Sequence, residues 1–424
     1  MKILIVGSGG REHAIAWKLS KENNVEKIYC APGNPGIGEV AQCLDINDSD
    51  IKNLVKFAKE NHIDLTVVGP EVPLVNGIVD EFEKEGLKIF GPNKECARFE
   101  GSKAFSKDFM IRHNIPTAKY KQYTNLDEAI NEIDSFGYPV VIKADGLAAG
   151  KGVVIPQNRE DAIATLKEMM SDKKFGSSGE KVVVEEFLSG IETSILAFVD
   201  NNTIVPMVSA KDHKKVYNFE KGPNTGGMGT FSPSEIYTDE LSKEIKKQIL
   251  NKTLDGFKKD NLNYKGILFV GLMITEDGPK VLEYNVRFGD PETQSVLFRL
   301  DTDLHKIMEA ILENRLKDIE INYKKEEVVC VMLTSGGYPE DYEKGKVITG
   351  IENLDEDIVV FHSGTKIVDG NLVTNGGRVI GITASADSVE EAAKKVYKNI
   401  EKINFEGMHY RTDIGMQLSK ELSF

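Results

Sequence analysis

The sequence predicts a multidomain protein of mixed α/β and α+β class, which begins with a doubly wound parallel sheet and ends with a small α/β domain. Two observations predict this class. The first hundred residues alternate short apolar runs with helical patterns, as parallel sheets do. Beyond them, apolar runs follow one another across turn residues, as antiparallel strands do. We expect four regions in the 424 residues, namely 1–103, 104–190, 191–325 and 326–424.

Composition and charge exclude several classes of protein. The formal net charge is −14 and the isoelectric point is about 5.2, which argues against a general nucleic-acid binder. Four scattered cysteines without a C-x-x-C spacing suit free thiols in a reducing cytosol. No apolar run approaches the ~18 residues of a membrane helix. We expect a cytoplasmic protein that binds neither nucleic acid nor membranes, and a monomer is the working expectation for its assembly.

The first region predicts strands over residues 2–7, 27–33, 64–70 and 87–92, with helices over 11–21 and 50–62. Ligands bind such sheets beyond the carboxyl ends of the strands. Those ends are "GSGGRE", "APGNPG" and "GPEVPL", which are rich in glycine and proline and could present backbone groups to a ligand.

The segment "GSGGRE" does not predict a dinucleotide site. Glu12 stands in place of the third glycine of G-x-G-x-x-G, and no acidic residue closes the second strand. Two interpretations stay open: a phosphate site at the helix N-terminus, with Arg11 as a partner, or a structural tight turn. We expect His13 and Trp17 on the following helix to be packing residues.

The stretch "KADGLAAGKGV", residues 143–153, predicts a glycine-tipped flap. Apolar β-branched runs enter and leave it, at 138–144 and 152–156, so it reads as a hairpin. It fails the P-loop pattern, because the glycines are one residue too close and Gly152 replaces the Ser or Thr that holds magnesium. A plain flexible turn is the alternative interpretation.

Further patterns complete the expected secondary structure. Helices are predicted over 106–114 and 158–172, and a strand, a short hinge and a second strand over 181–200. Strands and turns continue through 203–233, and a hairpin spans 266–290. The last region predicts strands over 328–335, 357–368 and 372–385, followed by a helix with Ser388 and Glu391 at capping-box spacing.

The segment "VLEYNVRFGDPE", residues 281–292, carries the chemistry. On a regular strand Glu283, Asn285 and Arg287 share one face with Val281, and the residues between them face the apolar side. A carboxylate, an amide oxygen and a guanidinium in line suit a hard cation that shares its coordination with phosphates. The solvent face of a hairpin is the alternative interpretation of this alternation.

Nucleotide contacts are expected near this strand. Backbone groups of residues 185–188 could hold an adenine, and Glu192 could reach a ribose. Lys143, at the end of the strand before the flap, could reach the α- and β-phosphates, and Lys103 is a second candidate for a phosphate contact.

Together these motifs resemble the ATP-grasp superfamily: a strand ending in lysine, a glycine flap, a hinge of two glutamates and an E-x-N strand. The longer segments "GSGGREHA", "GNPG", "KADGLAAGKGV", "GPNTGGMG" and "EYNVRFGDPETQ" resemble the glycinamide ribonucleotide synthetase family along nearly the whole chain. The resemblance implies an ATP-grasp fold in residues 104–325, with a flap lobe to residue 190 and a metal-binding lobe after it. It also implies that residues 1–103 bind substrate.

The resemblance further implies an ATP-dependent ligase of purine biosynthesis, with ATP and Mg²⁺ or Mn²⁺, that joins glycine to 5-phosphoribosylamine through a glycyl phosphate. The implied metal ligands are Glu283 and Asn285. The implied ATP contacts are Lys103, Lys143, Gly146, Gly150, Lys151, Gly152, Glu185, Glu186, Leu188 and Glu192. The implied substrate contacts are Gly9, Gly10, Arg11, Asn34, Glu71, Asn224, Gly226 and Arg287. The implied catalytic residues are Lys143, Asp212 and Arg287.

One feature departs from many ATP-grasp enzymes. The strand "GILFVGLMI", before the E-x-N strand, carries no second metal carboxylate. The metal site is therefore expected to be lean, or to draw on phosphate and water oxygens. Two other functions stay open: a different ATP-grasp ligase or carboxylase, and a nucleotide-binding regulator without catalysis.

Overall fold

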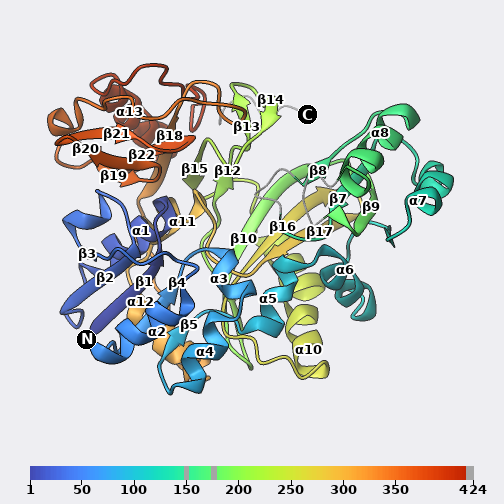
Figure 1. Ribbon diagram of the computed structural model, residues 1–424, viewed down its shortest axis with the longest axis horizontal. Coiled ribbons are helices and arrows are strands. Elements are labelled where there is room, and N and C mark those ends of the chain that lie inside the picture. Colours follow the sequence, from blue (N-terminus) through green and yellow to red (C-terminus); the bar gives the residue numbers. More distant parts are fainter. Residues whose placement is uncertain (148–151, 173–178, 417–424) are drawn as a thin grey trace.

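The computed structural model describes residues 1–147, 152–172 and 179–416. Figure 1 shows the N-terminal sheet and the C-terminal region on one side of the molecule, and a small lobe that contains α7 and α8 on the other. A third region, built around the long strands of the middle of the chain, lies between them.

The N-terminal region is a five-stranded parallel sheet in the order β3-β2-β1-β4-β5, as the alternation of strands and helices predicts. Its elements are β1 (Lys2–Gly7), α1 (Gly10–Leu19), β2 (Lys27–Pro32), a 3-10 turn (Ile37–Glu39), β3 (Gln42–Cys43), α2 (Ile51–Glu60), β4 (Leu65–Val68), α3 (Glu71–Val75), α4 (Ile78–Lys84) and β5 (Ile89–Phe90). Residues of β1 enter two different hydrophobic clusters, Ile3 and Ile5 in one and Leu4 and Val6 in the other. Both faces of the sheet are therefore buried, which explains the unbroken apolar run.

The small lobe has an antiparallel sheet in the order β6-β9-β7-β8, in agreement with the predicted flap hairpin. Its elements and the two helices that lead to it are α5 (Lys94–Gly101), α6 (Lys103–Arg112), β6 (Tyr120–Tyr123), α7 (Leu126–Glu132), a 3-10 turn (Ile133–Phe136), β7 (Val140–Ala144), β8 (Val153–Val154), α8 (Arg159–Met170) and β9 (Val182–Glu186). Tyr123, Val140, Leu166 and Val184 belong to a separate hydrophobic cluster. The lobe thus has its own core.

The central region is a four-stranded antiparallel sheet in the order β11-β10-β16-β17. Its elements are β10 (Ile191–Val199), β11 (Ile204–Pro206), α9 (Asp239–Ile245), a π-helical turn (Lys246–Leu250), α10 (Asn251–Lys259), β16 (Gly266–Thr275) and β17 (Gly278–Asn285). Strands β16 and β17 form a hairpin within the predicted span 266–290. The helices α9 and α10 are not in the sequence prediction, which names strands up to residue 233 and again from residue 266 and no helix between them.

Strand β17 carries a β-bulge that the sequence analysis misses. Val281 pairs with Leu272, but Glu283 pairs with Gly271, so Leu282 is an extra residue. Val281 is therefore fully buried in the core, although regular alternation places it on the face of Glu283. Leu282 and Glu283 instead both line the central pocket. The expected positions of Val281 and Leu282 are wrong for this reason.

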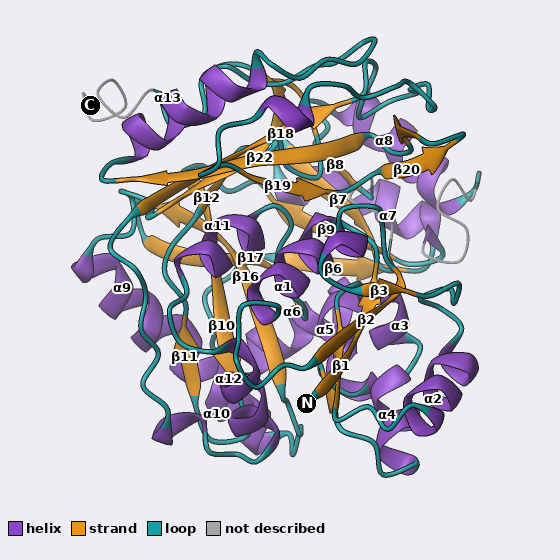
Figure 2. Cartoon of the chain, turned by 90° about the vertical axis from the view of Figure 1, so that its left-hand side faces the viewer, coloured by secondary structure: helices purple, strands orange, loops and turns teal. Residues whose placement is uncertain are grey.

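The C-terminal sheet has the order β12-β15-β18-β22-β19, and two of its strands come from the middle of the chain. Its elements, with two small hairpins and two 3-10 turns, are β12 (Lys211–Asp212), β13 (Lys215–Tyr217), β14 (Lys221–Asn224), β15 (Gly229–Ser232), a turn (Leu316–Asp318), β18 (Glu327–Thr334), a turn (Ile351–Asn353), β19 (Val359–His362), β20 (Thr365–Val368), β21 (Asn371–Thr374), β22 (Arg378–Ala386) and α13 (Val389–Ile400). Ser388 caps α13 by accepting a hydrogen bond from the Glu391 amide, as its spacing predicts. Figure 2 shows α13 above β18 and β22, with α11 below them.

Helices α11 (Glu292–Arg299) and α12 (Leu304–Leu312) follow β17 and fill the space under the N-terminal sheet. They share a hydrophobic cluster with β1 and with one face of β10 and β16. His13 and Trp17 of α1 pack as expected: His13 lies against Phe361, and Trp17 stacks on Phe298. Among the described helices, none is both long and apolar enough to span a membrane.

Candidate active site

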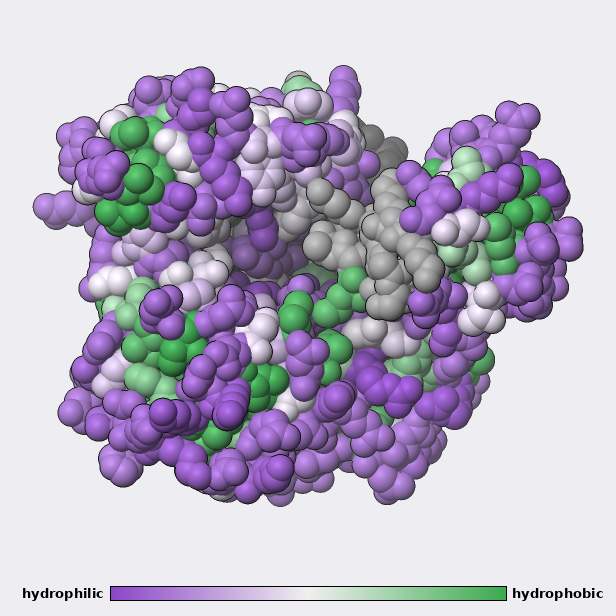
Figure 3. Space-filling view, in the orientation of Figure 1, coloured by the Kyte–Doolittle hydropathy of each residue, from purple (hydrophilic) through white to green (hydrophobic). Residues whose placement is uncertain are grey.

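A pocket of about 580 Å³ lies where the four regions meet. It opens into the hollow at the centre of Figure 3, below the C-terminal region. Most of its charged lining residues fall into two groups. We call Lys103, Lys107, Lys143 and Glu185 the lysine end, and Arg11, Arg287, Arg378, Glu71, Glu100 and Asp290 the arginine end.

At the lysine end, one buried carboxylate holds two lysines. Glu185, on β9, is 2% exposed and pairs with Lys143 of β7 at 2.9 Å and with Lys107 of α6 at 2.8 Å. The Lys143 ammonium also donates to the carbonyl oxygen of Leu282, the extra residue of the bulge, at 3.2 Å. This end therefore holds more positive than negative charge among its own side chains.

The surroundings lower the pKa of two lysines at this end, Lys107 and Lys103. Burial and the neighbouring Lys143 lower the pKa of Lys107 to about 8, against an opposing effect of Glu185. Burial also lowers the pKa of Lys103, whose ammonium donates to the carbonyl of Gly146 at 3.2 Å. An anion at this end would raise the pKa of both lysines, since an opposite charge favours the charged form of an amine.

The expected nucleotide hinge lies at the rim of the same end. Glu186, Leu188 and Glu192 all line the pocket, and Leu188 is buried while Phe187 is 43% exposed. Glu192 pairs with Lys214. Gly152 also lines the pocket, whereas Gly150 and Lys151 lie outside the described residues.

Glu283 and Asn285, the expected metal ligands, join the two ends. The Asn285 amide lies 3.5 Å from a Glu283 carboxylate oxygen, and its own oxygen accepts from Arg287 at 3.4 Å. Burial alone would raise the pKa of Glu283, but Lys214, Lys143 and Lys103 outweigh it and lower the pKa. The carboxylate is thus held ionised, which a cation ligand requires.

The donor set suits a hard cation with few protein ligands. A carboxylate and an amide side chain lie next to each other, with the amide nitrogen toward Glu283 and the amide oxygen toward Arg287. Carboxylate and amide oxygens are both ligand types that Mg²⁺ accepts. The described residues hold no cluster of three or more His, Cys, Asp or Glu that could bind a metal by itself. Such a pair fits an ion that takes its remaining ligands from phosphates and water.

At the arginine end, Arg287 lies between two carboxylates. Its guanidinium pairs with Glu100 at 3.0 Å and approaches Glu71 at 3.7 Å. Glu100 also accepts the backbone amide of Val286 at 2.8 Å. Burial raises the pKa of Glu100, while Arg287 and Arg11 outweigh burial and lower the pKa of Glu71.

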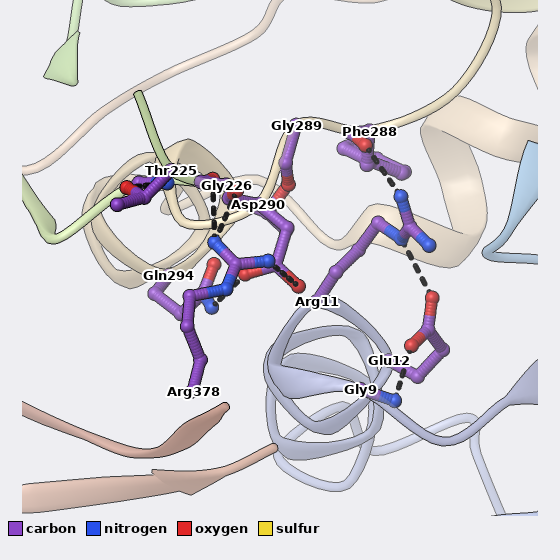
Figure 4. A network of polar contacts seen from close by, with 12 residues as sticks. Gly9, Arg11, Glu12, Thr225, Gly226, Phe288, Gly289, Asp290, Gln294 and Arg378 are labelled. Atoms are coloured by element: carbon purple, nitrogen blue, oxygen red, sulfur yellow. Dashed lines mark hydrogen bonds and ion pairs between the residues drawn. The ribbon is translucent and has the colours of Figure 1, made fainter. Parts of the chain in front are cut away.

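The first-strand loop is built as a closed turn. Glu12 replaces the third glycine and accepts from the Gly9 amide at 2.6 Å, so this amide already has a partner (Figure 4). The same carboxylate pairs with Arg11 at 2.6 Å. Arg11 lines the pocket, but Gly9 and Gly10 do not. Asn34 does not line it either, and bonds instead to Ser8, Ile37 and His362.

Asp212 and Glu292 bring two carboxylates to one wall of the pocket. Burial and the nearby Glu292 raise the pKa of Asp212 well above its usual value, and burial also raises that of Glu292. One carboxylate oxygen of Asp212 has no hydrogen-bond partner among the described residues. This wall is therefore suited to a cationic group.

The loop that holds Asn224 and Gly226 forms the adjoining wall. Thr225 closes it by accepting from the Gly227 amide and donating to the Lys214 carbonyl. Figure 4 shows Arg378 reaching from the C-terminal region to Gly226 and to Asp290, which also accepts from Gln294.

Six charged lining residues were not assigned a role from the sequence. They are Glu100, Lys107, Lys214, Asp290, Glu292 and Arg378. Asp290 and Glu292 lie in "GDPETQ", part of a motif used for the family resemblance, so the sequence could have indicated them as site residues. The other four lie in ordinary helix and strand patterns, and only the folded chain brings them to the pocket.

Comparison with protein families finds three consecutive matches. The N domain of phosphoribosylglycinamide synthetase matches residues 1–100, its ATP-grasp (A) domain matches residues 101–293, and its C domain matches residues 328–417. A phosphoribosylamine–glycine ligase of Caldanaerobacter subterraneus subsp. tengcongensis is 51% identical over 98% of this chain and 99% of its own.

Solved structures show the same arrangement. The phosphoribosylamine–glycine ligase of Thermotoga maritima matches with a TM-score of 0.84 and 35% identity, over 98% of this chain and all of the other. A biotin carboxylase of Campylobacter jejuni matches with a TM-score of 0.75 and 13% identity, over 96% of this chain and 92% of its own. The second likeness concerns the fold alone.

Proposed function

The chain belongs to the phosphoribosylglycinamide synthetase family, and from this premise we infer that it joins glycine to 5-phosphoribosylamine at the expense of ATP. The products are glycinamide ribonucleotide, ADP and phosphate, in purine biosynthesis. One observation carries the geometric argument: a lysine end and an arginine end meet in one pocket, joined by Glu283 and Asn285.

The reaction needs an activated carboxylate, because an amine cannot displace oxide from one directly. Transfer of the γ-phosphoryl group of ATP to glycine would form glycyl phosphate. The phosphoribosylamine nitrogen would then attack the glycyl carbonyl, and phosphate would leave with the C–O electron pair. Such a path asks the protein for positioning and charge neutralisation rather than for a nucleophile.

The lysine end suits the nucleotide. Lys143 and Lys107 share one carboxylate and so have capacity for the charge of the α- and β-phosphates. Lys103 approaches the start of the flap through Gly146, which supports a phosphate contact for it as well. The backbone of residues 186–188, with Glu192 beside it, suits the adenosine part.

The arginine end suits the other substrates. Arg287 and Arg11 line it and can neutralise a phosphate or a carboxylate. Asp212 can accept a hydrogen bond from the amino group of glycine, because one of its oxygens has no other partner among the described residues. A cation at this position would favour the ionised form of Asp212 and Glu292, whose pKa values are raised in the ligand-free protein. Glu71, Asn224 and Gly226 complete the wall around this group.

Glu283 and Asn285 would hold Mg²⁺ or Mn²⁺. When bound, such an ion neutralises the phosphate oxygens during transfer. Lys214 lies close enough to Glu283 and Glu192 for both carboxylates to raise its pKa, against burial, so it stays charged beside the reacting phosphate.

Two other functions remain to be separated by experiment. A carboxylase of the same fold would bind ATP but need no phosphoribosylamine. A nucleotide-binding regulator would bind ATP and release no ADP, which the ionised Glu283 argues against.

The experiment measures ADP release by the purified protein with ATP and magnesium. We expect release only when glycine and phosphoribosylamine are both present. Release with glycine alone would point to an uncoupled acyl-phosphate former, release with bicarbonate would point to a carboxylase, and no release would support a regulator.

We also propose that the protein acts in the cytoplasm, and acts there as a monomer. All four cysteines are free, which supports a reducing compartment. A monomer is supported by the lining of the pocket, to which all four regions of a single chain contribute.

A further inference from the structure

We infer that Arg378 and Tyr338, both from the C-terminal region, are positioning residues that hold the walls of the arginine end in shape for glycine and phosphoribosylamine. This inference rests on the proposed function and deepens it. It assigns the C-terminal region a role in substrate use and none in nucleotide binding.

Arg378 bridges two loops that come from different parts of the chain. It stands at the first position of β22, and one guanidinium nitrogen donates to the Gly226 carbonyl at 2.6 Å and to the Asp290 carbonyl at 2.7 Å. A second nitrogen pairs with the Asp290 carboxylate at 3.2 Å. A planar fork that makes three such contacts fixes the distance between the loops, which a lysine cannot do.

Tyr338 holds the same loop at the other backbone group of Gly226. Its hydroxyl oxygen accepts from the Gly226 amide at 2.9 Å. A side-chain carbon at position 226 would come within 3.2 Å of both the Arg378 guanidinium and the Tyr338 hydroxyl. A larger residue here would therefore press on both contacts. The amide and the carbonyl group of Gly226 are each held by one C-terminal side chain.

Arg378 also sets the charge balance at this end. Burial alone would raise the pKa of Asp290, but Arg378 and Arg11 outweigh it, so the carboxylate stays ionised. Without Arg378, the charge of Asp290 would face Arg11 and Arg287 alone. Those two guanidiniums would then be drawn toward a protein carboxylate rather than toward substrate anions.

The effect should be confined to one end of the pocket. Within the described part of the C-terminal region, Arg378 alone lines the pocket. The residues of the lysine end come from positions 103 to 185. The side chains of its three lysines contact residues at positions 117, 146, 185 and 282. A change at Arg378 should therefore reach glycine and phosphoribosylamine before it reaches ATP.

The test compares Arg378→Lys and Tyr338→Phe with wild type. ADP formation gives kcat and KM for glycine and phosphoribosylamine, and calorimetry gives the Kd of a non-hydrolysable ATP analogue. We expect Arg378→Lys to lower kcat/KM for both substrates by about tenfold to a hundredfold, the scale of a small misplacement of reacting groups. Tyr338→Phe should lower it by about threefold. The Kd of the ATP analogue should change by less than about twofold in both variants.

Arg411→Lys is the matched control. Arg411 is a buried arginine of the same region that pairs with Asp413 and Glu220, and it does not line the pocket. The Arg411→Lys substitution should lower the melting temperature without changing kcat/KM for the substrates relative to the Kd of the ATP analogue. If both Arg378→Lys and Tyr338→Phe leave kcat/KM unchanged, or if both weaken ATP binding in parallel, the inference is overturned. A wild type that releases no ADP would overturn both the proposed function and this inference. If the wild type is active but the variants lose substrate use and ATP binding together, or lose neither, only this inference is overturned.

Discussion

The two ends of the pocket handle charge in opposite ways. At the lysine end, Lys107 and Lys143 share the single carboxylate of Glu185. At the arginine end each guanidinium has a carboxylate partner: Arg11 has Glu12, Arg287 has Glu100, and Arg378 has Asp290. One end depends on its ligand for balance, and the other is balanced by the protein before any ligand arrives.

The ends also differ in how the chain builds them. The lysine end comes mostly from one stretch, residues 103 to 185, whose members pair across neighbouring strands and a helix. The arginine end collects residues from positions 11, 71, 100, 287, 290 and 378. The end that we propose for the nucleotide is therefore local in sequence, whereas the end that we propose for the other substrates is assembled across the whole chain.

The largest expected effect comes from the residues that join the two ends. Glu283→Gln keeps the shape and removes the charge, so turnover should fall about a hundredfold or more, as when one preorganised electrostatic group is lost. Folding should stay nearly intact, because the side chain faces the pocket. The measurement is ADP formation against magnesium concentration.

Thermal melts of the same variant serve as the control. A Glu283→Gln protein that turns over normally at equal magnesium would mean that the metal is bound elsewhere. The lysine and arginine ends would then not be joined through this residue.

The second prediction tests whether the two ends of the pocket bind different ligands. Lys143→Met should raise the Kd of an ATP analogue by about 30-fold or more, the scale for truncating one partner of a buried charge pair, and should leave phosphoribosylamine binding nearly unchanged. Arg287→Lys should show the reverse pattern, because it keeps the charge but loses the fork that Glu100 and Asn285 contact.

Titration calorimetry of each ligand with each variant gives the four values needed. Two variants with the same pattern would show that the ends are coupled, and the division between them would have to be abandoned.

The third prediction concerns pH and the lysine end alone. Because the pKa of Lys107 is lowered to about 8, its charge is lost as pH rises through 8. If the bound state requires the proton, the Kd of an ATP analogue should rise about tenfold between pH 7 and pH 9. Lys107→Met should bind weakly at both values and show a flat profile. A profile as steep as that of wild type would assign the dependence to another group.

The lowered pKa of Lys107 affects the stability of the folded protein in the opposite direction. A folded pKa of about 8 lies below the usual value of 10.5, so the folded protein binds fewer protons than the unfolded chain between these values. This group alone therefore makes the free energy of unfolding of the ligand-free protein rise with pH in that window. Binding and stability should diverge above pH 8.

The smallest effect is expected outside both ends. Ser388→Ala removes the cap of α13 and should lower the free energy of unfolding by about 1 kcal/mol, with kcat and KM unchanged. Urea unfolding and ADP formation measure the two quantities. A change in KM would show that the C-terminal region transmits any loss of stability to the pocket, and would weaken the case for Arg378 as a specific contact.

Much of this could be predicted from the sequence. The parallel N-terminal sheet follows from unbroken apolar strands, and both faces of β1 are buried as such strands require. Lys143, Glu185 and Glu283 were identified because each lies in a short motif whose spacing is set within one or two strands.

The bulge in β17 and several residues of the pocket could not be predicted, because the alternation of residues along a strand does not reveal them. Leu282 is one extra residue in a ladder, and nothing in the alternation of β17 reveals it, so Val281 was placed on the wrong face. Lys107 lies in the helix α6, among residues that read as ordinary helix positions. Arg378 reaches the pocket because β22 begins next to β18, which a pattern within one segment cannot show.

The C-terminal sheet combines strands from the middle and from the end of the chain, and this affects when its strands can pair during synthesis. Strand β15 is buried at all four positions, but its partner β18 begins about 100 residues later in the chain. At a synthesis rate of about 5–20 residues per second, β15 leaves the ribosome roughly 5–20 s before it can pair with β18. During that time the edge of β15 that will pair with β18 has no partner strand, while β16 and β17 are being completed. The nascent chain would thus carry nearly all the residues that line the pocket before Arg378 exists to hold the loops of Gly226 and Asp290 together.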